Sequence, residues 1–295
     1  MTTDGGDGGR GPVQVRGRVL SNEPVGDYRH LTLVAPGVPE RTRPGAFVAL
    51  AVGGPGTAML LRRSFSVYRA RAAGVYGGTV EVVLAVHGPG TAWLAGLRPR
   101  DEVDLVGPLG RPFTLPKEQV PCVLVGGGYG SAPLFGLAEQ LRDRGCPVHM
   151  VLGASSGRRL FGVLEARRAA QSVEVSTDDG SLGTRGVVTD VLPAVLERTG
   201  GAVVYACGPM AMLGAVARVA ERHGVWSQCA VEEQMACGVG VCMTCVLPVR
   251  GTDGAVRMVR SCTEGPVFRG DRVLWDAAGT VPAETVGAPR AGGLR

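Results

Sequence analysis

The stretch from residue 237 to 262 holds four cysteines whose spacing constrains the chain more than any other feature. Cys237, Cys242 and Cys245 form the pattern C-x4-C-x2-C, and Cys262 follows further along. Glycines lie between the first two cysteines, and glycine can take backbone angles that are closed to other residues. The chain can therefore wrap closely around whatever the four sulfurs bind, which predicts a compact module built on a metal centre.

This spacing is that of plant-type [2Fe–2S] ligation, in which four thiolates hold two irons. Gly238 and Gly240 would free backbone amides to point at sulfur and tune the reduction potential. Structural zinc is one alternative, but it usually takes two short cysteine knuckles, and this loop has one. Buried core cysteines are another alternative, although such residues would not gather in a glycine loop. The pattern favours an iron–sulfur cluster.

The composition fits a globular protein of the reducing cytoplasm. The chain has 295 residues, 8 of them cysteine, with 45% hydrophobic content, 19% charged content and a formal net charge of +5. We expect no signal peptide, no membrane span and no disulfides. Arginines and acids are interspersed, which disfavours a nucleic-acid surface. Cys122 and Cys146 are expected to be buried hydrophobes, and Cys229 to be another or to line the approach to the cluster.

Three composition regimes predict a multi-domain β plus α/β protein. Short alternating runs broken by Gly and Pro fill residues 12–116 and predict an antiparallel β-barrel. Strands alternate with helices over 117–227, which predicts a parallel sheet covered on both faces. The cysteine loop and two short strands occupy 228–280. The two ends, 1–11 and 281–295, are expected to be disordered.

Basic and hydroxyl residues mark the strand at 61–70, LRRSFSVYRA, inside the predicted barrel. An alternating strand would place Arg63 and Phe65 on one face. Ser64 and Ser66 would share the other face. The planar guanidinium of Arg63 suits a pyrophosphate, because it donates hydrogen bonds in pairs. A solvated strand end explains this stretch alone equally well.

Two further barrel segments favour a phosphorylated ligand. Gly90 and Thr91, in GPGT, open a short predicted helix, and the first turn of a helix attracts an anion. The next strand is followed by VGPLG at 106–110, which predicts a tight turn. Together with Arg63, these segments indicate that the barrel binds a phosphorylated cofactor.

Two motifs lie at strand ends in the alternating half. VGGGYGSAPL follows a predicted strand and opens a helix, although it lacks the last glycine of the dinucleotide fingerprint. YACGPMAML ends another predicted strand at the same edge of the sheet, where ligands bind in open α/β sheets. A simple strand-to-helix turn is the alternative for CGPM. The two motifs together favour a dinucleotide at this edge of the sheet.

The chain is similar to ferredoxin-reductase-type flavoproteins and, within them, resembles the electron-transfer subunits of two-component dihydroorotate dehydrogenase (type B). The resemblance runs over about residues 12–276. Its motifs are RRSFSV, GPGT, VGPLGRPF, GGGYGSAPL, STDDGSLGTRGVVTD, YACGPMAM, EEQMACGVGVCMTC and SCTEGPVF. The last two are the most specific, because the general reductase fold does not require them.

The resemblance implies one FAD, one [2Fe–2S] cluster, a nicotinamide cofactor and no catalytic acid or base in this chain. It also implies a partner subunit with FMN, which oxidises dihydroorotate to orotate in pyrimidine synthesis, in a heterotetramer of two plus two. Electrons would pass from FMN through the cluster to FAD and leave as hydride to NAD.

The same resemblance implies the residues that contact each cofactor. The expected FAD contacts are Arg63, Ser64, Phe65, Ser66, Gly90, Thr91 and, through backbone atoms, Val83, Leu84 and Ala85. The expected contacts of the nicotinamide dinucleotide are Gly126, Gly127, Gly128, Cys207, Gly208, Pro209 and Met210. The expected cluster ligands are Cys237, Cys242, Cys245 and Cys262.

Three departures from the family pattern bear on these contacts. Leu84 and Ala85 replace the family's Tyr-Arg pair in the strand before the phosphate helix, so flavin contacts there would have to be made by the backbone. Ser64 replaces a proline in the flavin strand, which removes some rigidity there. The loop after the second strand of the alternating half reads ASSGRRLF, where the family often has an acidic pair. Ser155, Arg158 and Arg159 would suit the 2′-phosphate of NADP, or they form a solvated loop end. NAD is the expected cofactor and NADP the alternative.

Two other functions stay open from the sequence. A reductase with the same cofactors could serve a different partner, such as an oxygenase, a hydrogenase or a ferredoxin. An iron–sulfur sensing module without turnover is a second alternative, but it would leave the flavin and nicotinamide motifs without a use.

Overall fold

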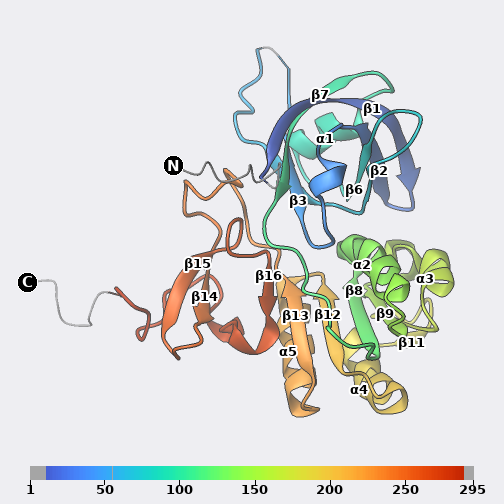
Figure 1. The fold of residues 1–295 in the computed structure, drawn as a ribbon, viewed down its shortest axis with the longest axis vertical. Helices are drawn as coiled ribbons and strands as arrows, with labels where there is room; N and C mark the ends of the chain where they lie inside the picture. Colours follow the sequence, from blue (N-terminus) through green and yellow to red (C-terminus); the bar gives the residue numbers. More distant parts are fainter. Residues whose placement is uncertain (1–10, 55, 289–295) are drawn as a thin grey trace, which may run out of the picture.

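The computed structural model describes residues 11–54 and 56–288, which form a barrel, an α/β layer beneath it and a smaller module at the side (Figure 1). The expected disordered lead over residues 1–11 lies outside the described residues, apart from Gly11. Within these described ranges, no helix has the length and apolar character needed to cross a membrane.

Seven antiparallel strands form the barrel sheet in the order β4-β3-β7-β1-β2-β6-β5. Buried and more accessible residues alternate along β7, because one face of the strand is turned toward the barrel core. Asn22 fixes helix α1 by donating to the carbonyls of Leu94 and Leu97, both at 2.9 Å. The elements are β1 (Val13–Val25), β2 (Tyr28–Val34), β3 (Phe47–Leu50), β4 (Arg63–Ser66), β5 (Arg69–Arg71), β6 (Thr79–Leu84), α1 (Pro89–Ala95) and β7 (Glu102–Leu109).

One barrel prediction is wrong. The segment 106–110 is not a tight turn after a strand, because β7 continues to Leu109. Gly107 pairs with Val13 of β1, and Leu109 pairs with Phe47 of β3. Residues 106–109 therefore lie in the sheet, between β1 and β3.

The α/β layer has a seven-stranded sheet in the order β11-β10-β9-β8-β12-β13-β16, parallel except for β16. Strand β8 has β9 on one side and β12 on the other, so the strand order reverses there. The first five residues of β8 and all of β12 are buried, as expected of parallel strands covered on both faces. The strands are β8 (Cys122–Gly127), β9 (Val148–Ala154), β10 (Ser172–Thr177), β11 (Thr184–Arg185), β12 (Val203–Cys207), β13 (Trp226–Ala230) and β16 (Val267–Arg269).

Four helices cover the two faces of this sheet, α2 and α3 on the side of the barrel and α4 and α5 on the other (Figure 1). Helix α4 begins where Asp190 accepts a hydrogen bond from the Val187 N–H and ends at Gly200 in the left-handed region. The helices are α2 (Ala132–Asp143), α3 (Val163–Ala169), α4 (Val188–Thr199) and α5 (Met210–Arg222). The predicted order of strands and helices in this half is confirmed.

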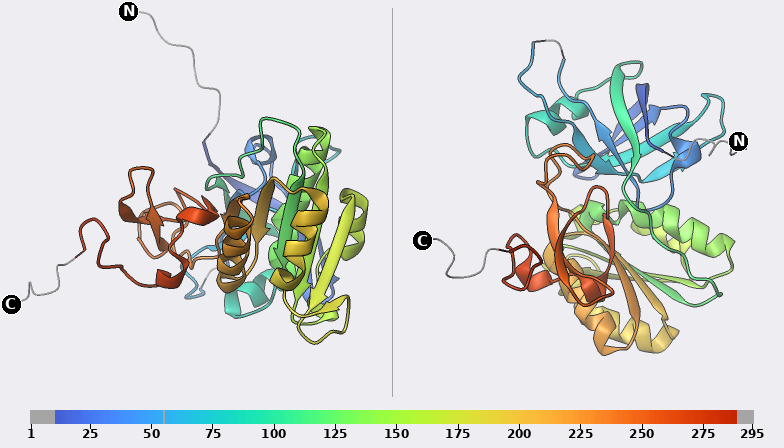
Figure 2. Two further views of the ribbon diagram at one scale, coloured as in Figure 1. Left: turned by 90° about the horizontal axis from the view of Figure 1, so that it is seen from below. Right: turned by 60° about the vertical axis from the view of Figure 1, so that its left-hand side comes forward.

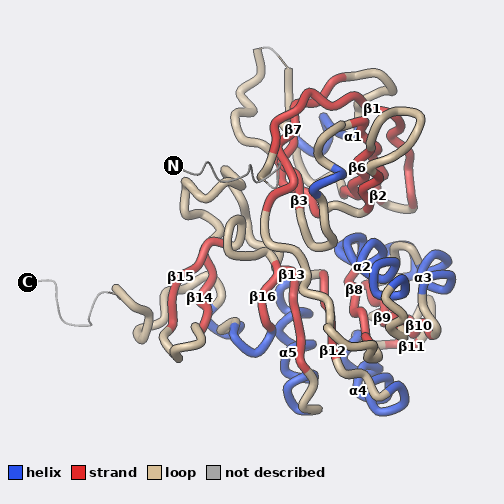
Figure 3. The backbone as a smooth tube through the Cα atoms, in the orientation of Figure 1, coloured by secondary structure: helices blue, strands red, loops and turns tan. Residues whose placement is uncertain are grey.

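The cysteine-bearing module is joined to the sheet rather than separate from it. The predicted boundary at residue 228 falls inside β13, and β16 returns from the module to pair with β13. Both views in Figure 2 place the module beside this edge of the sheet. Between β13 and β14 (Val246–Arg250) the chain is loop, and β14 pairs with β15 (Val256–Arg260) (Figure 3).

The expected disordered tail over 281–295 needs a correction in its first part. Thr285 is buried, and the Val286 N–H donates to the carbonyl of Val256 at 2.9 Å, so this segment packs along β15. Residues 289–295 lie outside the described part of the chain.

Candidate functional site

Two cavities meet where the barrel, the sheet and the module come together. The first, the barrel pocket, has a volume of about 270 Å³ and is lined by β4, the end of β6 and residues 231–235. The second, the sheet pocket, has a volume of about 520 Å³ and lies over the carboxyl ends of the parallel strands. Tyr129, Gly130 and Glu232 line both cavities. A group in one pocket would therefore lie next to a group in the other.

Most of the expected flavin contacts gather at the barrel pocket. Phe65 also packs on the barrel core, and Leu84 has its side chain buried inside that core, so only its backbone could face a ligand. Arg63 lies against Gly90, where an added Cβ would be 2.8 Å from the guanidinium Nε. The Thr91 hydroxyl accepts from the Gly88 N–H and caps α1. The expected residues that line the pocket are Ser64, Phe65, Ser66, Val83, Ala85 and Thr91.

The sheet pocket lies at the reversal of strand order around β8, where open α/β sheets bind ligands. Of the expected contacts, Gly127, Gly128 and Pro209 line it. Gly127 allows close packing of the loop, because a Cβ there would lie 2.7 Å from the sulfur of Met212 and 2.9 Å from Cδ of Pro209. Met212 itself lines the pocket.

The other expected dinucleotide contacts lie beside this pocket and do not line it. Met210 packs on the hydrophobic core under α5. Cys207 is 2% exposed, and burial together with the nearby Glu232 carboxyl raises the pKa of its thiol. At Gly126 a Cβ would lie 2.4 Å from that of Ser131, so the glycine allows close packing of loop and helix. Gly208 has a φ of +152° and packs against Gly127.

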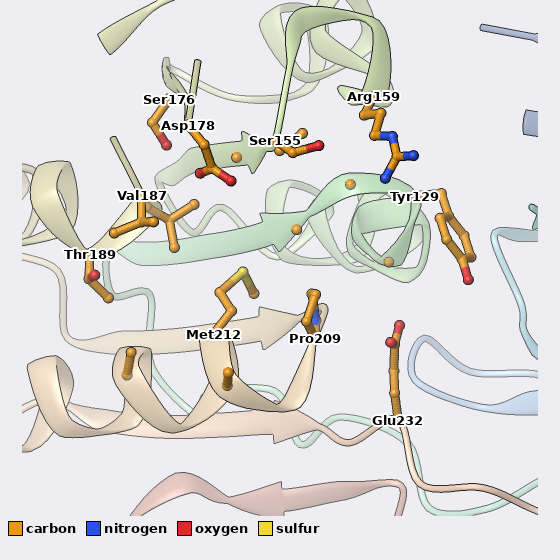
Figure 4. A pocket seen from close by; sticks show the side chains of 18 of the residues that line it. Tyr129, Ser155, Arg159, Ser176, Asp178, Val187, Thr189, Pro209, Met212 and Glu232 are labelled. Atoms are coloured by element: carbon orange, nitrogen blue, oxygen red, sulfur yellow. The ribbon is translucent and has the colours of Figure 1, made fainter. Parts of the chain in front are cut away.

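The sheet pocket is polar at both ends (Figure 4). Ser176 and Asp178, from the end of β10, lie at one end, and Tyr129 and Glu232 lie at the other. The Ser176 hydroxyl is buried and finds no hydrogen-bond partner within the described residues. That orphaned donor and the Asp178 carboxylate form a polar end that suits a ligand with hydroxyl groups.

Sequence reasoning missed Glu232, which lies between the two pockets. The residue as a whole is exposed, but its carboxyl end faces the junction, where an added Cβ on Gly130 would be 3.0 Å from Oε1. Burial of that end raises the pKa of the Glu232 carboxyl. The available signal was its position: Glu232 follows β13 at the same sheet edge as Cys207, where ligands bind.

The arginines proposed for a 2′-phosphate have different surroundings. Arg158 is 86% exposed and pairs with Asp27 of the barrel at 3.2 Å. Arg159 lines the sheet pocket, and its carbonyl accepts a hydrogen bond from the Tyr28 hydroxyl at 2.8 Å. Ser155 lines the pocket too. The structure therefore brings Ser155 and Arg159 to the pocket and leaves Arg158 at the surface beside the barrel.

The four loop cysteines form two pairs. The Cys242 thiol lies within hydrogen-bonding reach of Cys237, and Cys262 lies within reach of Cys245. Two pairs of thiolates match a centre with two irons.

The hairpin register explains the second pair. Val246 pairs with Arg260, and the Ser261 N–H donates to the Cys245 carbonyl at 2.9 Å, so Cys245 and Cys262 are brought to the same end of β14 and β15. Both of these cysteines are buried against the barrel residues Phe47, Ala49 and Leu109.

The glycine loop explains the first pair. Positive φ angles at Gly238 (+71°) and Gly240 (+84°) turn the chain so that the N–H groups of Val239 and Val241 donate to the Cys237 sulfur at 3.5 and 3.3 Å. Hydrogen bonds donated to the Cys242 sulfur, first of all by Thr244, lower the pKa of the Cys242 thiol to about 6. The lower pKa favours the thiolate, which is the form that binds iron. The donor set and its amides therefore fit an iron–sulfur cluster.

The loop between β13 and β14, residues 231–245, is called the cluster loop below, and it also contacts the barrel pocket. A Cβ on Gly238 would lie 3.3 Å from the Ser64 hydroxyl of β4 and 3.6 Å from Phe47 of β3. Ser64 lines the barrel pocket as well. The cysteine centre, the barrel pocket and the sheet pocket thus follow one another in a continuous row.

A barrel, a nucleotide-type sheet and a pocket at their junction are the architecture of ferredoxin-reductase-like flavoproteins, here with an added iron–sulfur module. A solved structure described as giving "insights into flavin-based electron bifurcation via the NADH-dependent reduced ferredoxin-NADP oxidoreductase structure" is similar to 89% of this chain. The match covers 91% of that chain, with a TM-score of 0.76 and 29% identity.

The sequence comparisons are more specific. Residues 232–274 match the family model of the iron–sulfur cluster binding domain of dihydroorotate dehydrogenase B. A protein of Bacillus caldolyticus named dihydroorotate dehydrogenase B (NAD(+)), electron transfer subunit, is 41% identical over 83% of this chain and 91% of its own length. A protein of the same name from Desulforamulus reducens is 34% identical over 82% of this chain and 90% of its own length. The chain therefore belongs to the family of electron transfer subunits of dihydroorotate dehydrogenase B.

Proposed function

We propose that this chain passes electrons from an FMN-containing dihydroorotate dehydrogenase subunit to NAD⁺, through a [2Fe–2S] cluster and an FAD. The observation that carries the proposal is the row of three sites. The cluster loop packs on Ser64, Ser64 lines the barrel pocket, and the barrel pocket shares Glu232 with the sheet pocket. When bound, the flavin supplies the exchange between single electrons from the cluster and a hydride to the nicotinamide.

The barrel pocket is the proposed site of the flavin ring. The β4 residues Ser64, Phe65 and Ser66 would line one side, with Ser64 and Ser66 supplying hydroxyls for polar ring atoms. Arg63, beside Gly90 at the start of α1, would hold the pyrophosphate with a guanidinium that donates in pairs. Gly130 contributes only backbone atoms to the wall that this pocket shares with the sheet pocket. Because Gly130 has no side chain, a nicotinamide could approach the flavin across this wall.

The sheet pocket is the proposed site of the nicotinamide dinucleotide, with NAD preferred over NADP. Asp178 and Ser176 lie at the end of the pocket away from the flavin side, where the adenosine ribose would lie. A carboxylate accepts hydrogen bonds from ribose hydroxyls and repels a 2′-phosphate. Arg159 lies elsewhere along the pocket (Figure 4), which supports NAD as the first choice.

The exposed rim of the cluster loop is the proposed docking site of the FMN subunit. Val241 is 79% exposed, and Met243 and Val239 are about half exposed, so apolar side chains surround the accessible Cys242. One-electron transfer needs the two redox centres close together, and Cys242 is the one exposed residue among the four expected cluster ligands. Two copies of each subunit are the proposed stoichiometry. A reducing cytoplasm is the proposed compartment, and it suits eight cysteines that form no disulfide within the described residues.

The test is reconstitution. The chain is purified without air, its flavin, iron and sulfide are measured, and it is mixed with a candidate FMN subunit and dihydroorotate. We expect NAD⁺ reduction only when both subunits are present, and a complex whose mass fits two plus two. Reduction of NAD⁺ by the FMN subunit alone, or a chain free of iron and flavin, would contradict the proposal.

A second function is favoured by one observation. The structure with a TM-score of 0.76 belongs to an NADH-dependent reduced ferredoxin-NADP oxidoreductase. We therefore keep as the alternative a reductase with the same cofactors that serves another redox partner. Rapid NADH-dependent reduction of a ferredoxin, together with no dihydroorotate-dependent activity in the reconstituted mixture, would select this alternative.

A further inference from the structure

We propose that the hydroxyl groups of Thr244 and Thr263 donate hydrogen bonds to the cluster's sulfur atoms and thereby raise its reduction potential. Each threonine serves one of the two cysteine pairs. The inference rests on the proposed function only in requiring that the cluster is present.

Thr244 lies at the first cysteine pair. Its hydroxyl donates to the Cys242 sulfur at 3.0 Å. Met243, between these two residues, has a φ of +60°, which turns the chain so that the Thr244 side chain points back over Cys242. The Cys242 sulfur therefore accepts a hydrogen bond from a side-chain hydroxyl.

Thr263 lies at the second cysteine pair. It follows Cys262 directly, and its side chain packs against the cluster loop: a Cβ on Gly240 would lie 2.7 Å from its Cγ2 and 3.7 Å from its Oγ1. The Thr263 hydroxyl is buried, and it has no hydrogen-bond partner in the ranges 11–54 and 56–288. Buried hydroxyls are almost always paired, so an orphaned one against the cluster loop points to a partner that arrives with the cluster.

The same module holds a matched comparison. Thr285 is also buried and also has an unpartnered hydroxyl within the described chain. It bridges to Val256, at the opposite end of β15 from the cysteines. A hydroxyl there can affect folding of the module but lies at the end of β15 away from the expected cluster ligands.

The sign of the effect follows from charge. Reduction adds one electron to the cluster and makes its sulfurs more negative, while no bond to threonine forms or breaks and the hydroxyl keeps its proton. A hydrogen bond is stronger to the more negative acceptor. Each hydroxyl therefore stabilises the reduced cluster more than the oxidised cluster, and its removal lowers the potential.

The experiment measures the cluster rather than turnover. Thr244→Val, Thr263→Val and the control Thr285→Val are prepared as full-length chains without air, and iron and sulfide are counted in each. The midpoint potential is then read by titration followed by electron paramagnetic resonance. We expect each cluster variant to bind a full cluster whose reduction equilibrium is shifted up to about tenfold, or about 59 mV, toward the oxidised form. Thr285→Val should keep the wild-type potential.

Serine variants complete the test, since Thr244→Ser and Thr263→Ser keep the hydroxyl and should restore the potential. If Thr263→Val and Thr263→Ala lose the cluster but Thr263→Ser keeps it, the Thr263 hydroxyl is needed to bind the cluster, and the potential of Thr244→Val decides the effect on reduction. Wild-type potentials in cluster-loaded valine variants would overturn it, as would loss of the cluster in all three Thr263 variants. A wild-type chain without iron would instead refute the proposed function.

Discussion

Two carboxyl groups, those of Glu232 and Asp178, line the sheet pocket at opposite ends. Glu232 lies where both pockets meet, and burial raises the pKa of its carboxyl group. A raised pKa means that the folded state holds the proton more tightly than the unfolded chain, so this group opposes folding as the pH rises through its folded pKa. Such a cost is typical of a functional position. Asp178 lies at the other end of the pocket (Figure 4), where its carboxylate can accept hydrogen bonds from ribose hydroxyls and repel a 2′-phosphate.

Asp178→Asn should relax the choice between the two nicotinamide cofactors. Loss of the negative charge removes the repulsion of a 2′-phosphate, so we expect the ratio of kcat/KM for NADPH to that for NADH to rise about tenfold, or about 1.4 kcal/mol. The measurement is steady-state reduction of a dye by each cofactor. Arg158→Ala is the control and should leave the ratio unchanged, because Arg158 pairs with Asp27 outside the pocket. An unaltered ratio in Asp178→Asn would count against the proposed ribose contact.

At the scale of elements, a hairpin and a glycine loop make the cysteine centre between them. The register of β14 and β15 fixes Cys245 beside Cys262. The loop before β14 brings the other two cysteines, and the Arg260 guanidinium ties it down by donating to the Gly240 carbonyl at 2.9 Å. Neither element forms the centre alone.

Gly240→Ala should damage the cluster and spare the flavin. Gly240 has a φ of +84°, and a Cβ there would lie 2.7 Å from Thr263, so strain and a clash act together. We expect iron and sulfide per chain to fall by more than half, with FAD content unchanged. Gly254→Ala, in the turn of the same hairpin, has a φ of +80° but open space around it. That control carries similar strain, about 1 kcal/mol, and should keep its iron.

On the scale of the whole molecule, ionic and aromatic contacts hold the barrel on the α/β layer. Arg69 of β5 forms ion pairs with Glu165 of α3 and, at 2.9 Å, with Glu139 of α2. Tyr68 donates to Glu165 and packs edge-on against Phe135. The desolvated site raises the pKa of the Tyr68 hydroxyl, which stays protonated as a donor. The position of the barrel, and hence the row of three sites, depends on these contacts.

Glu165→Gln should loosen that junction. Removal of a mostly buried charge leaves Arg69 with one remaining carboxylate, so we expect a loss of about 2 kcal/mol in the free energy of unfolding. The measurement is urea unfolding of the cofactor-loaded chain. Glu174→Gln breaks a more exposed pair with Arg198 at 2.8 Å within the α/β layer and should cost less than about 1 kcal/mol. Equal losses in the free energy of unfolding for the two variants would show that partial burial does not strengthen the ion pair between Arg69 and Glu165.

Local patterns were enough to predict the order of barrel, α/β half and cysteine module, because hydrophobic periodicity and glycine positions act over a few residues. They also indicated that glycines after β8 would line a pocket, and that four cysteines would gather in one module, where their role as cluster ligands stays a prediction. They failed where distant segments decide the outcome. The segment 106–110 has turn-like residues, yet β1 and β3 hold residues 106–109 in the sheet. In CGPM, Met210 packs on the core, while Met212, two residues along α5, lines the pocket.

What the sequence by itself determined is the chemistry available: four thiolates at cluster spacing, an arginine and serine strand, and glycines that let a ligand approach. Only the tertiary structure decided the order of those sites. Glu232 joins two pockets because β13 ends beside the barrel, and Ser64 touches the cluster loop because the module folds back on β3 and β4. The physical reason is that electron transfer depends on the distances between segments that are far apart in the chain. Local propensity does not determine those distances, whereas tertiary packing does.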